Sequence, residues 1–314
     1  MYQSGLDVFL KQKHKKYQKL RLGVVCHPAS INKDLKHISE LILQKSLGLK
    51  VSSFFGPQHG IRGEKQDNMV ESQDFVDPAT ALPVHSLYGT HRTPTAESMK
   101  DIDAFLIDLQ DIGTRIYTFI YTMANCMRAA RFHNKKVIVL DRANPIGSKL
   151  VEGNILEPQL VSFVGQFSIP VRHGMTTAEL ALMFNEQFDI GCDLEIVPYR
   201  GLERKQCADE WEWDWVNPSP NIPQFITSLT FPGTVLIEGT NLSEGRGTTR
   251  PLEIVGAPFI RADVLAKALN RQKLPGVYFR PCYFQPTFQK WTGEVCGGIH
   301  IHVLNKNTFR PYLV

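Results

Sequence analysis

The first two thirds of the chain alternate short apolar runs with longer amphipathic stretches. Apolar runs without helical spacing are typical of strands that are buried on both faces of a sheet. They predict strands at Leu20–His27, Leu49–Phe55, Pro83–Gly89, Ala104–Leu109, Val137–Asp141 and Leu194–Tyr199. Helices are predicted between them, around Leu35–Gln44, as a turn or two at Thr95–Lys100, at Tyr117–His133 and at Met175–Phe188.

Strands that alternate with helices indicate a parallel sheet whose connections cross over its faces. We therefore predict an α/β fold with a Rossmann-like, mostly parallel sheet and helices on both faces. The helix at Met175–Phe188 has the clearest start signal, because Thr176 is a suitable N-cap and Glu179 follows three residues later to complete a capping box.

The pattern changes near Thr227, after a loop at Trp211–Pro223 that is rich in tryptophan and proline. Beyond it we predict a helix near Ala262–Asn270 and three short strands, at Thr234–Glu238, Val277–Phe279 and Gly298–Val303. We accordingly divide the chain into a Rossmann-like domain over residues 1–228 and a smaller α+β domain over residues 229–314.

Composition narrows the classes of function. A content of 43% hydrophobic and 21% charged residues in 314 is typical of an ordinary soluble protein, and a net charge of +4 is too mild to indicate nucleic-acid binding. No apolar run reaches the roughly 18 residues that a membrane helix needs, so no membrane insertion is expected. The six cysteines form no C-x-x-C pair, which argues against a zinc site and a disulfide framework.

The N-terminal stretch MYQSGLDVFLKQKHKK lacks the order of a signal peptide, because its charges follow its weak apolar patch. We expect a cytoplasmic protein, or one whose export signal has been removed.

Polar, glycine-bearing segments directly follow four of the predicted strands: GPQHGIRG (56–63), LQDIGTR (109–115), DRANPIG (141–147) and EGTNLSEGRGTT (238–249). In a parallel sheet such loops emerge at one edge, where ligands bind. Carboxylates, amides and arginines are mixed in them, which suits a polyhydroxylated, partly anionic ligand such as a sugar acid. These side chains are His59, Arg62, Glu64, Asp108, Asp111, Arg115, Asp141, Arg142, Asn144, Glu238, Asn241, Glu244 and Arg246.

Each of these groups also has an ordinary structural explanation. Asp108 or Asp111 could cap the helix that follows. Arg142 could pair with Asp141 across a turn, and His59 could be a hydrogen-bonded loop histidine. The functional reading therefore depends on several segments meeting at one place.

Familiar catalytic motifs are absent. The first strand is followed by CHPASIN, where a dinucleotide site needs G-x-G-x-x-G, and neither a P-loop nor a G-x-S-x-G elbow occurs. The run Arg172-His173-Gly174 matches the R-H-G of histidine phosphatases, but it precedes a helix in mid-chain and does not follow the first strand. Carboxylate chemistry remains, as in glycoside hydrolysis, which uses either two carboxyl groups or a 2-acetamido group of the substrate as nucleophile.

The segments also resemble a known family, the NamZ-like exo-β-N-acetylmuramidases, bacterial proteins long known as a domain of unknown function. The resemblance rests on FFGPQHGIRG (54–63), SLYG (86–89), IDLQDIGTRIYTFIYTM (107–123), VLDRANPIG (139–147), VEGN (151–154), PVRHGMTTAELA (170–181), PSPNIP (218–223) and EGTNLSEGRGTTRPLE (238–253). It implies a glycosidase of cell-wall turnover that releases terminal N-acetylmuramic acid from the non-reducing end of peptidoglycan fragments. No metal or organic cofactor is implied, and the expected partner is a muropeptide or amino-sugar fragment.

The resemblance also suggests roles for the residues of the motifs. Catalytic candidates are Asp111, Glu244, Glu64 and His59, and the first three are the candidate acids. Substrate-binding candidates are Gln58, Arg62, Asp108, Arg115, Tyr117, Arg142, Asn144, His173, Asn221, Asn241 and Arg246. Among these, an arginine at 115, 142 or 246 is expected to hold the lactyl carboxylate, because a guanidinium matches a carboxylate well.

The chain departs from the family pattern at two points. Many members have P-E-H-G where this chain has Pro57-Gln58-His59-Gly60, and an amide cannot exchange a proton at useful pH. A protein that binds muropeptides or other glycans without cutting them is therefore the alternative. The chain also ends at FRPYLV, earlier than expected, so we predict that its second domain is truncated.

Overall fold

The computed structural model describes residues 1–66 and 71–314, which divide into two compact units. The first comprises Met1–Val151 and Ile155–Pro220, and the second Glu152–Asn154 and Asn221–Val314. Each unit is described by itself below.

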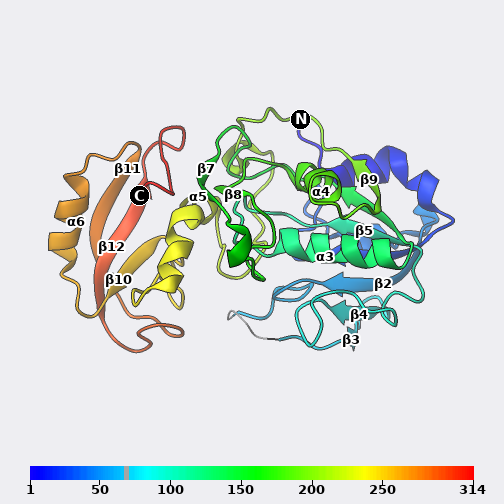
Figure 1. The fold of residues 1–314 in the computed structure, drawn as a ribbon, viewed down its shortest axis with the longest axis horizontal. Coiled ribbons are helices and arrows are strands. Elements are labelled where there is room, and N and C mark those ends of the chain that lie inside the picture. Colours follow the sequence, from blue (N-terminus) through cyan, green and yellow to red (C-terminus); the bar gives the residue numbers. More distant parts are fainter. Residues whose placement is uncertain (67–70) are drawn as a thin grey trace. The chain divides into compact units, whose positions relative to one another are not determined.

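The first unit is built on a seven-stranded sheet in the order β3-β4-β2-β1-β5-β6-β9 (Figure 1). The strands are β1 (Arg21–Cys26), β2 (Lys50–Gly56), β3 (Phe75–Val76), β4 (Pro83–Ser86), β5 (Ala104–Asp108), β6 (Lys136–Leu140) and β9 (Asp193–Val197). All neighbours are parallel except β3 and β4. The predicted mostly parallel sheet is therefore confirmed.

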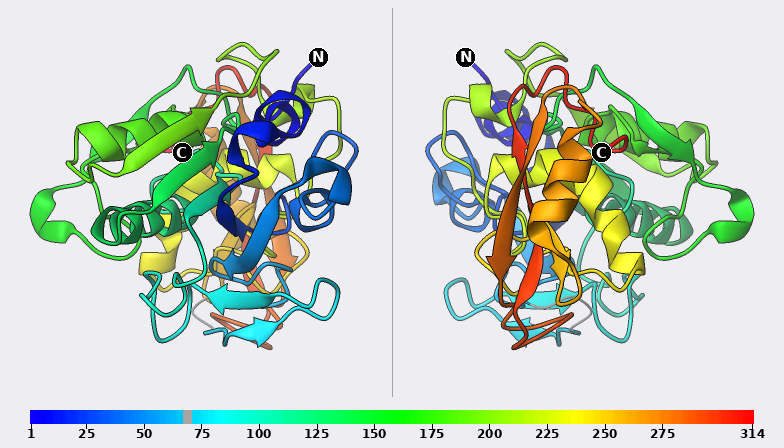
Figure 2. Two further views of the ribbon diagram at one scale, coloured as in Figure 1. Left: turned by 90° about the vertical axis from the view of Figure 1, so that its right-hand side faces the viewer. Right: turned by 90° about the vertical axis from the view of Figure 1, so that its left-hand side faces the viewer.

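The parallel strands follow the doubly wound order, in which successive strands are added first on one side of β1 and then on the other. Helices cover both faces, as Figure 2 shows. Short helices α1 (Gly5–Val8) and α2 (Ile38–Leu41) pack one face, where Leu6, Ile38 and Leu106 belong to one apolar cluster. Longer helices α3 (Phe119–Phe132) and α4 (Thr177–Glu186) pack against the strands on the other face.

The local signals of the first unit are largely confirmed. Thr176 caps α4, and Glu179 closes the predicted capping box. The helix expected around Leu35–Gln44 is wrong in its length, since only Ile38–Leu41 is α-helical. Leu35 adopts a φ of +60°, which no α-helix accommodates. The short strands β7 (Glu152–Ile155) and β8 (Pro170–Arg172) lie outside the main sheet.

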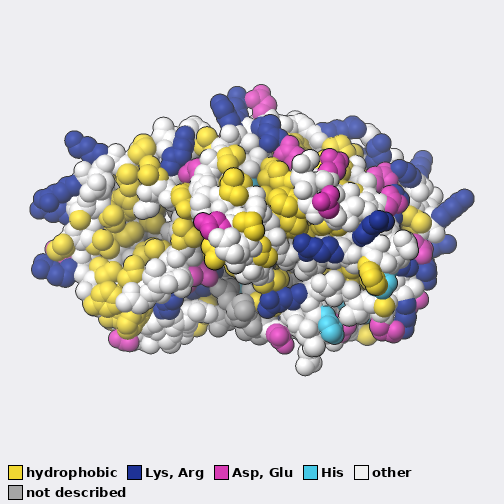
Figure 3. All heavy atoms as spheres, in the orientation of Figure 1, with side chains coloured by type: hydrophobic (Ala, Val, Ile, Leu, Met, Phe, Trp, Pro, Cys, Tyr) yellow, Lys and Arg dark blue, Asp and Glu magenta, His cyan; other side chains and the backbone are white. Residues whose placement is uncertain are grey.

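The second unit contains an antiparallel sheet in the order β10-β12-β11, formed by Ile254–Ala257, Cys296–Val303 and Val277–Phe284. Helix α6 (Ala262–Asn270) packs on it, as predicted. In the space-filling view of Figure 3, hydrophobic side chains lie on the surface of this unit.

The predicted strand Thr234–Glu238 is wrong. Helix α5 (Phe225–Thr234) and a 3₁₀ segment, Val235–Gly239, occupy this part of the chain. The Thr234 hydroxyl donates to the carbonyls of Thr230 and Leu252, at 3.1 and 2.9 Å, so local and tertiary hydrogen bonds override the β-propensity of the segment. Strand β10 was missed, because four residues that include Gly256 carry little pattern.

Over the residues that the structure describes, no helix is long and apolar enough to cross a membrane.

Candidate functional site

The strand order places a candidate site at the carboxyl ends of β1 and β5. Along the chain, β2 and β4 are added on one side of β1, whereas β5, β6 and β9 are added on the other side. The loops that leave β1 and β5 therefore diverge to opposite faces of the sheet. In open α/β sheets this divergence forms the crevice in which ligands bind. The loops are those that begin at His27 and at Leu109, and the second contains Asp111.

Asp111 is held from one side only. Its Oδ2 accepts from the Gly113 N–H at 2.7 Å and lies 3.0 Å from Nε2 of His173. Because the Met175 N–H donates to His173 Nδ1, the neutral ring carries its proton on Nε2 and donates it to Asp111. Within residues 1–66 and 71–314, the other oxygen, Oδ1, has no hydrogen-bond partner although it is buried. An unsatisfied buried carboxylate oxygen is costly, and it is expected where a ligand completes the site.

Gln58 lies in the loop after β2, the neighbour of β1. Its Oε1 accepts from the Thr118 hydroxyl at 2.9 Å, just before α3. The contact joins the loop after β2 to the segment that follows Asp111. Thr118 is a candidate site residue that sequence reasoning missed, because it fell within the predicted helix Tyr117–His133, whereas α3 begins at Phe119.

Asn144 lies in the loop after β6, on the other side of β5. Its Oδ1 accepts from the Ile146 N–H at 3.1 Å, and its Nδ2 donates to the Met175 carbonyl at 3.1 Å. Gly113 adopts a φ of +85°, and a Cβ there would lie 2.5 Å from Asn144 Oδ1. Glycine is therefore required at this position both for its conformation and for the close approach of the two loops.

The loops after β2, β5 and β6 thus bring Gln58, Asp111 and Asn144 to one edge of the sheet, as the sequence predicted. His173 joins them from the segment after β8. The loops at this edge thus carry one incompletely satisfied carboxylate and two amides, groups that hydrogen-bond hydroxyl and acetamido substituents.

His27 braces this edge from the end of β1. The Gln110 N–H donates to its Nε2 at 2.7 Å, and its Nδ1 lies 3.2 Å from the Pro218 carbonyl. The ring must stay neutral to accept from Gln110, and burial accordingly lowers the pKa of His27 well below its ordinary value. His37 donates toward the His27 carbonyl, and burial also lowers the pKa of His37.

We expect the protein to lose stability as the pH falls below about 6.5, the ordinary histidine pKa. Protons then bind the unfolded chain but not the folded one, so each such histidine removes up to about 1.4 kcal/mol per pH unit. Urea unfolding at pH 7.5 and 5.5 measures this slope. His27→Gln, whose amide oxygen can replace the Nε2 acceptor, should flatten it, whereas replacement of the exposed His91 by Gln serves as the surface control. Equal slopes in the wild type and His27→Gln would contradict the assignment.

Asp108 and Arg142 form a buried ion pair across neighbouring strands. Nε and one Nη of Arg142 donate to the two carboxylate oxygens of Asp108, at 2.6 and 2.7 Å, and the guanidinium also donates to the Ile31 carbonyl at 2.8 Å. The two side chains are 0% and 2% exposed. Burial lowers the pKa of Arg142, but the Asp108 charge outweighs it and raises the pKa above its ordinary value.

Arg142 therefore pairs with Asp108 and not with Asp141, the partner weighed from the sequence. Asp141 accepts from the Ala178 N–H at 2.9 Å in the first turn of α4, and burial raises its pKa to about 6. Arg142 and Asp141 therefore do not pair with each other across the turn.

Two further candidates lie close to Asp111 along the chain. Arg115 is 7% exposed, and its Nη1 donates to the Ile169 carbonyl at 2.6 Å. Tyr117 is also buried, and burial raises its pKa, opposed by a hydrogen bond with Ser219.

His59, Arg62 and Glu64 lie beyond Gln58 in the same loop. His59 is buried at a φ of +73°, and its Nδ1 lies 2.6 Å from the Lys65 carbonyl that accepts from it. Arg62 pairs with Asp77. Glu64 is exposed and lines a cavity of about 450 Å³ together with Gly56 and Gly60.

The remaining candidates belong to the second unit. Arg246 Nη1 bridges Glu238 and Glu244, at 2.5 and 2.9 Å, and Glu244 Oε2 lies 3.5 Å from Lys290 Nζ. Glu244 is only 3% exposed, and burial raises the pKa of its neighbour Glu238. Asn241 is exposed, whereas Asn221 is 5% exposed.

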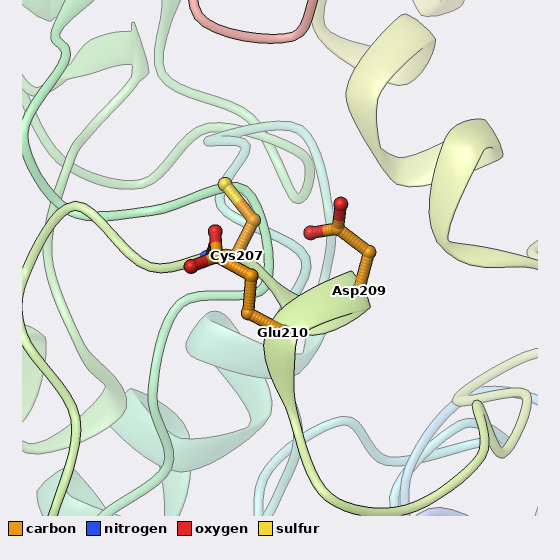
Figure 4. Close-up of side chains that lie close together, drawn as sticks. All are labelled: Cys207, Asp209 and Glu210. Carbon is orange, nitrogen blue, oxygen red and sulfur yellow. Dashed lines mark hydrogen bonds between the residues drawn. The ribbon is translucent and has the colours of Figure 1, made fainter.

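One cluster has the residue types of a metal site. Ligand atoms of Cys207, Asp209 and Glu210 lie within 4.8 Å of one another (Figure 4). Cys207 and Glu210 form a reciprocal cap at the start of a 3₁₀ turn. The Cys207 N–H donates to Glu210 Oε1 at 3.3 Å, and the Cys207 thiol accepts from the Glu210 backbone N–H. The cluster is a helix-start motif, and we assign it no metal.

Comparisons with known proteins agree with this architecture. Residues 22–226 match the family model of the exo-β-N-acetylmuramidase NamZ N-terminal domain, and residues 229–314 match that of the C-terminal domain. The peptidoglycan β-N-acetylmuramidase NamZ of Bacillus subtilis is 44% identical over 307 residues, which cover 98% of this chain and 74% of that protein.

Two solved structures of DUF1343 family proteins from Bacteroides fragilis are also similar. One superposes with a TM-score of 0.90 at 35% identity, covering 99% of this chain and 79% of its own. The other gives a TM-score of 0.79 at 27% identity, covering 100% and 82%. Both family models match in order and together span nearly the whole chain, so the protein belongs to the NamZ family of exo-β-N-acetylmuramidases.

Proposed function

We propose that this protein is a glycoside hydrolase that releases N-acetylmuramic acid from the non-reducing end of peptidoglycan fragments. Family membership supports the reaction, and a relative 44% identical over 98% of the chain is a peptidoglycan β-N-acetylmuramidase. The observation that carries the assignment to residues is Asp111 in the loop after β5, whose buried Oδ1 has no hydrogen-bond partner within the described part of the chain.

Asp111 acts as a carboxylate in this proposal. Two N–H groups already donate to its Oδ2, an arrangement that suits the ionised form, which only accepts hydrogen bonds. Its Oδ1 is then available to accept the N–H of the 2-acetamido group. That contact orients the acetamido oxygen toward the anomeric carbon, as substrate-assisted glycosidases require. His173 is the positioning residue that fixes the carboxylate.

Gln58 and Asn144 bind substituents of the same sugar. The Gln58 Oε1 is held by Thr118, so its NH₂ group is the part that offers hydrogen bonds to the ligand. An amide cannot protonate the leaving oxygen, and this step falls to another group, for which Glu64 and His59 are the candidates in the same unit; Glu244 belongs to the second unit and stays a prediction from the sequence.

The lactyl carboxylate requires a cation. Arg142 is the least suited arginine, because Asp108 and Ile31 already engage its guanidinium in the interior. Within the first unit Arg115 is therefore the proposed partner, assisted by the polar side chains of Arg62 and Tyr117, whereas Arg246, Asn221 and Asn241 belong to the second unit and stay predictions from the sequence.

Two isomeric disaccharides test the proposal. N-acetylmuramyl-β-1,4-N-acetylglucosamine should be split into its two sugars, and mass spectrometry of the products detects free N-acetylmuramic acid. The reversed disaccharide, with N-acetylglucosamine at the non-reducing end, is the matched control and should stay intact. Cleavage of the reversed disaccharide alone would contradict the proposed specificity.

Binding without turnover is the alternative that Gln58 raises, and family membership favours hydrolysis over it. If the first disaccharide raises the melting temperature of the protein but no product forms at long incubation, the protein is a glycan-binding member of the family and the proposed hydrolysis is wrong.

A further inference from the structure

The second unit carries an exposed aromatic ring, Phe259, next to a half-buried one, Trp291. Phe259 follows β10 and is 60% exposed, and Trp291 lies in the loop between β11 and β12. Their ring centroids are 5.9 Å apart and their planes meet at 77°. The two rings therefore pack against each other in a T-shaped arrangement, and we call this pair the aromatic corner.

The loop that carries Trp291 is held in a costly conformation. Gln289 and Trp291 have φ values of +69° and +62°, a region that residues with large side chains rarely adopt. Strained backbone of this kind persists only where the surroundings enforce it, and it is concentrated at functional sites.

The surroundings that enforce it are hydrogen bonds to the segment 237–242. Lys290 Nζ donates to the carbonyls of Ile237, Glu238 and Leu242, at 3.1, 2.9 and 3.0 Å. The Trp291 indole N–H donates to the Asn241 carbonyl at 2.8 Å. The ring is therefore fixed before any ligand arrives, which lowers the entropy lost on binding.

Polar side chains adjoin the rings. Asn241 and Thr292 are exposed, and so is Glu294, whose backbone N–H donates to the Trp291 carbonyl. Rigid aromatic faces next to amide, hydroxyl and carboxylate groups suit a pyranose ring, which has apolar C–H faces and polar hydroxyl edges.

We propose that the aromatic corner binds one N-acetylated sugar ring of a glycan strand by stacking. The choice of a glycan as occupant rests on the proposed function, whereas the corner itself rests on Phe259, Trp291 and the strained loop. The corner is thus proposed as a saccharide-binding surface of the second unit.

Titration calorimetry with tetra-N-acetylchitotetraose tests the proposal on the whole chain. Trp291→Asn removes the indole ring, and asparagine tolerates the positive φ at this position. Phe259→Ala removes the other aromatic ring. Each should weaken the affinity about five- to tenfold, the range expected for loss of an aromatic contact. Trp291→Phe should retain most of the affinity. Tyr283→Ala is the matched control, because Tyr283 is 71% exposed on β11 outside the corner.

The same variants are assayed with the disaccharide of the proposed function. If the wild type cleaves the disaccharide but does not bind the tetrasaccharide, or if the two corner variants bind as the wild type does, the corner is wrong while the hydrolase proposal stands. If no cleavage occurs and the corner variants still lose affinity, the corner stands and the hydrolase proposal fails. Equal losses in Tyr283→Ala would also overturn the corner.

Discussion

Asp111→Asn should reduce the turnover of an N-acetylmuramide substrate by about 10²–10⁴-fold, the usual range for removing a catalytic carboxylate or its electrostatic contribution. The amide has nearly the same shape, and its oxygen can still accept from Gly113 and His173, so the fold should be retained. The group at the position of Oδ1 is then an NH₂ donor that repels the acetamido N–H. Release of a chromogenic aglycone measures the rate.

Asp209→Asn is the matched control, because Asp209 is an exposed carboxylate in the same unit. It should leave the rate unchanged. The melting temperature of Asp111→Asn should lie close to that of the wild type, which separates a catalytic defect from unfolding. Full activity of a folded Asp111→Asn protein would remove Asp111 from the mechanism.

Arg142→Met should destabilise the fold by about 3–5 kcal/mol, because it leaves the Asp108 carboxylate buried without its partner. Both side chains are almost completely inaccessible to water, so solvent cannot replace the lost contact. Denaturant unfolding followed by circular dichroism measures the change in the free energy of unfolding.

Two controls separate this effect from loss of a surface charge. Lys100→Met removes an exposed pair with Glu97 and should leave the free energy of unfolding nearly unchanged, because solvent screens exposed pairs. The double variant Asp108→Leu with Arg142→Met should be more stable than Arg142→Met alone, because no unpaired charge remains. A loss of less than about 1 kcal/mol in Arg142→Met would show that the pair does not stabilise the interior.

The periodicity of the sequence predicted the parts of the fold that depend on local pattern. Buried strands appear as apolar runs, and the Thr176 capping box is a signal carried by two residues. The change from apolar to polar residues at the end of β5 also placed Asp111 at the carboxyl edge of the sheet, where we propose that the ligand binds, because parallel strands end at a common edge.

Pairing between loops could not be predicted in the same way. Asp108 and Arg142 are 34 residues apart, and the sequence pointed only to the adjacent Asp141 as a partner for Arg142. Gln58 and Thr118 are 60 residues apart, and their contact depends on the order of β2 and α3 in space. His27 carried a usable signal, since a polar residue at the carboxyl end of the first strand lies at the reversal of strand order.

The error at Thr234–Glu238 has a related cause. β-Branched residues favour strands on average, but the environment of a segment decides its conformation when the intrinsic preference is small. Here the Leu252 carbonyl, distant in sequence, accepts from Thr234 and helps to hold the end of a helix.

A crystal structure with bound N-acetylmuramic acid would test most directly whether separate strand-end loops hold one amino sugar. The proposal predicts the acetamido nitrogen within about 3.2 Å of Asp111 Oδ1, a normal hydrogen-bond distance, with Gln58 and Asn144 contacting the same ring. A sugar bound elsewhere, with Asp111 Oδ1 contacting only protein or water, would contradict the proposed site.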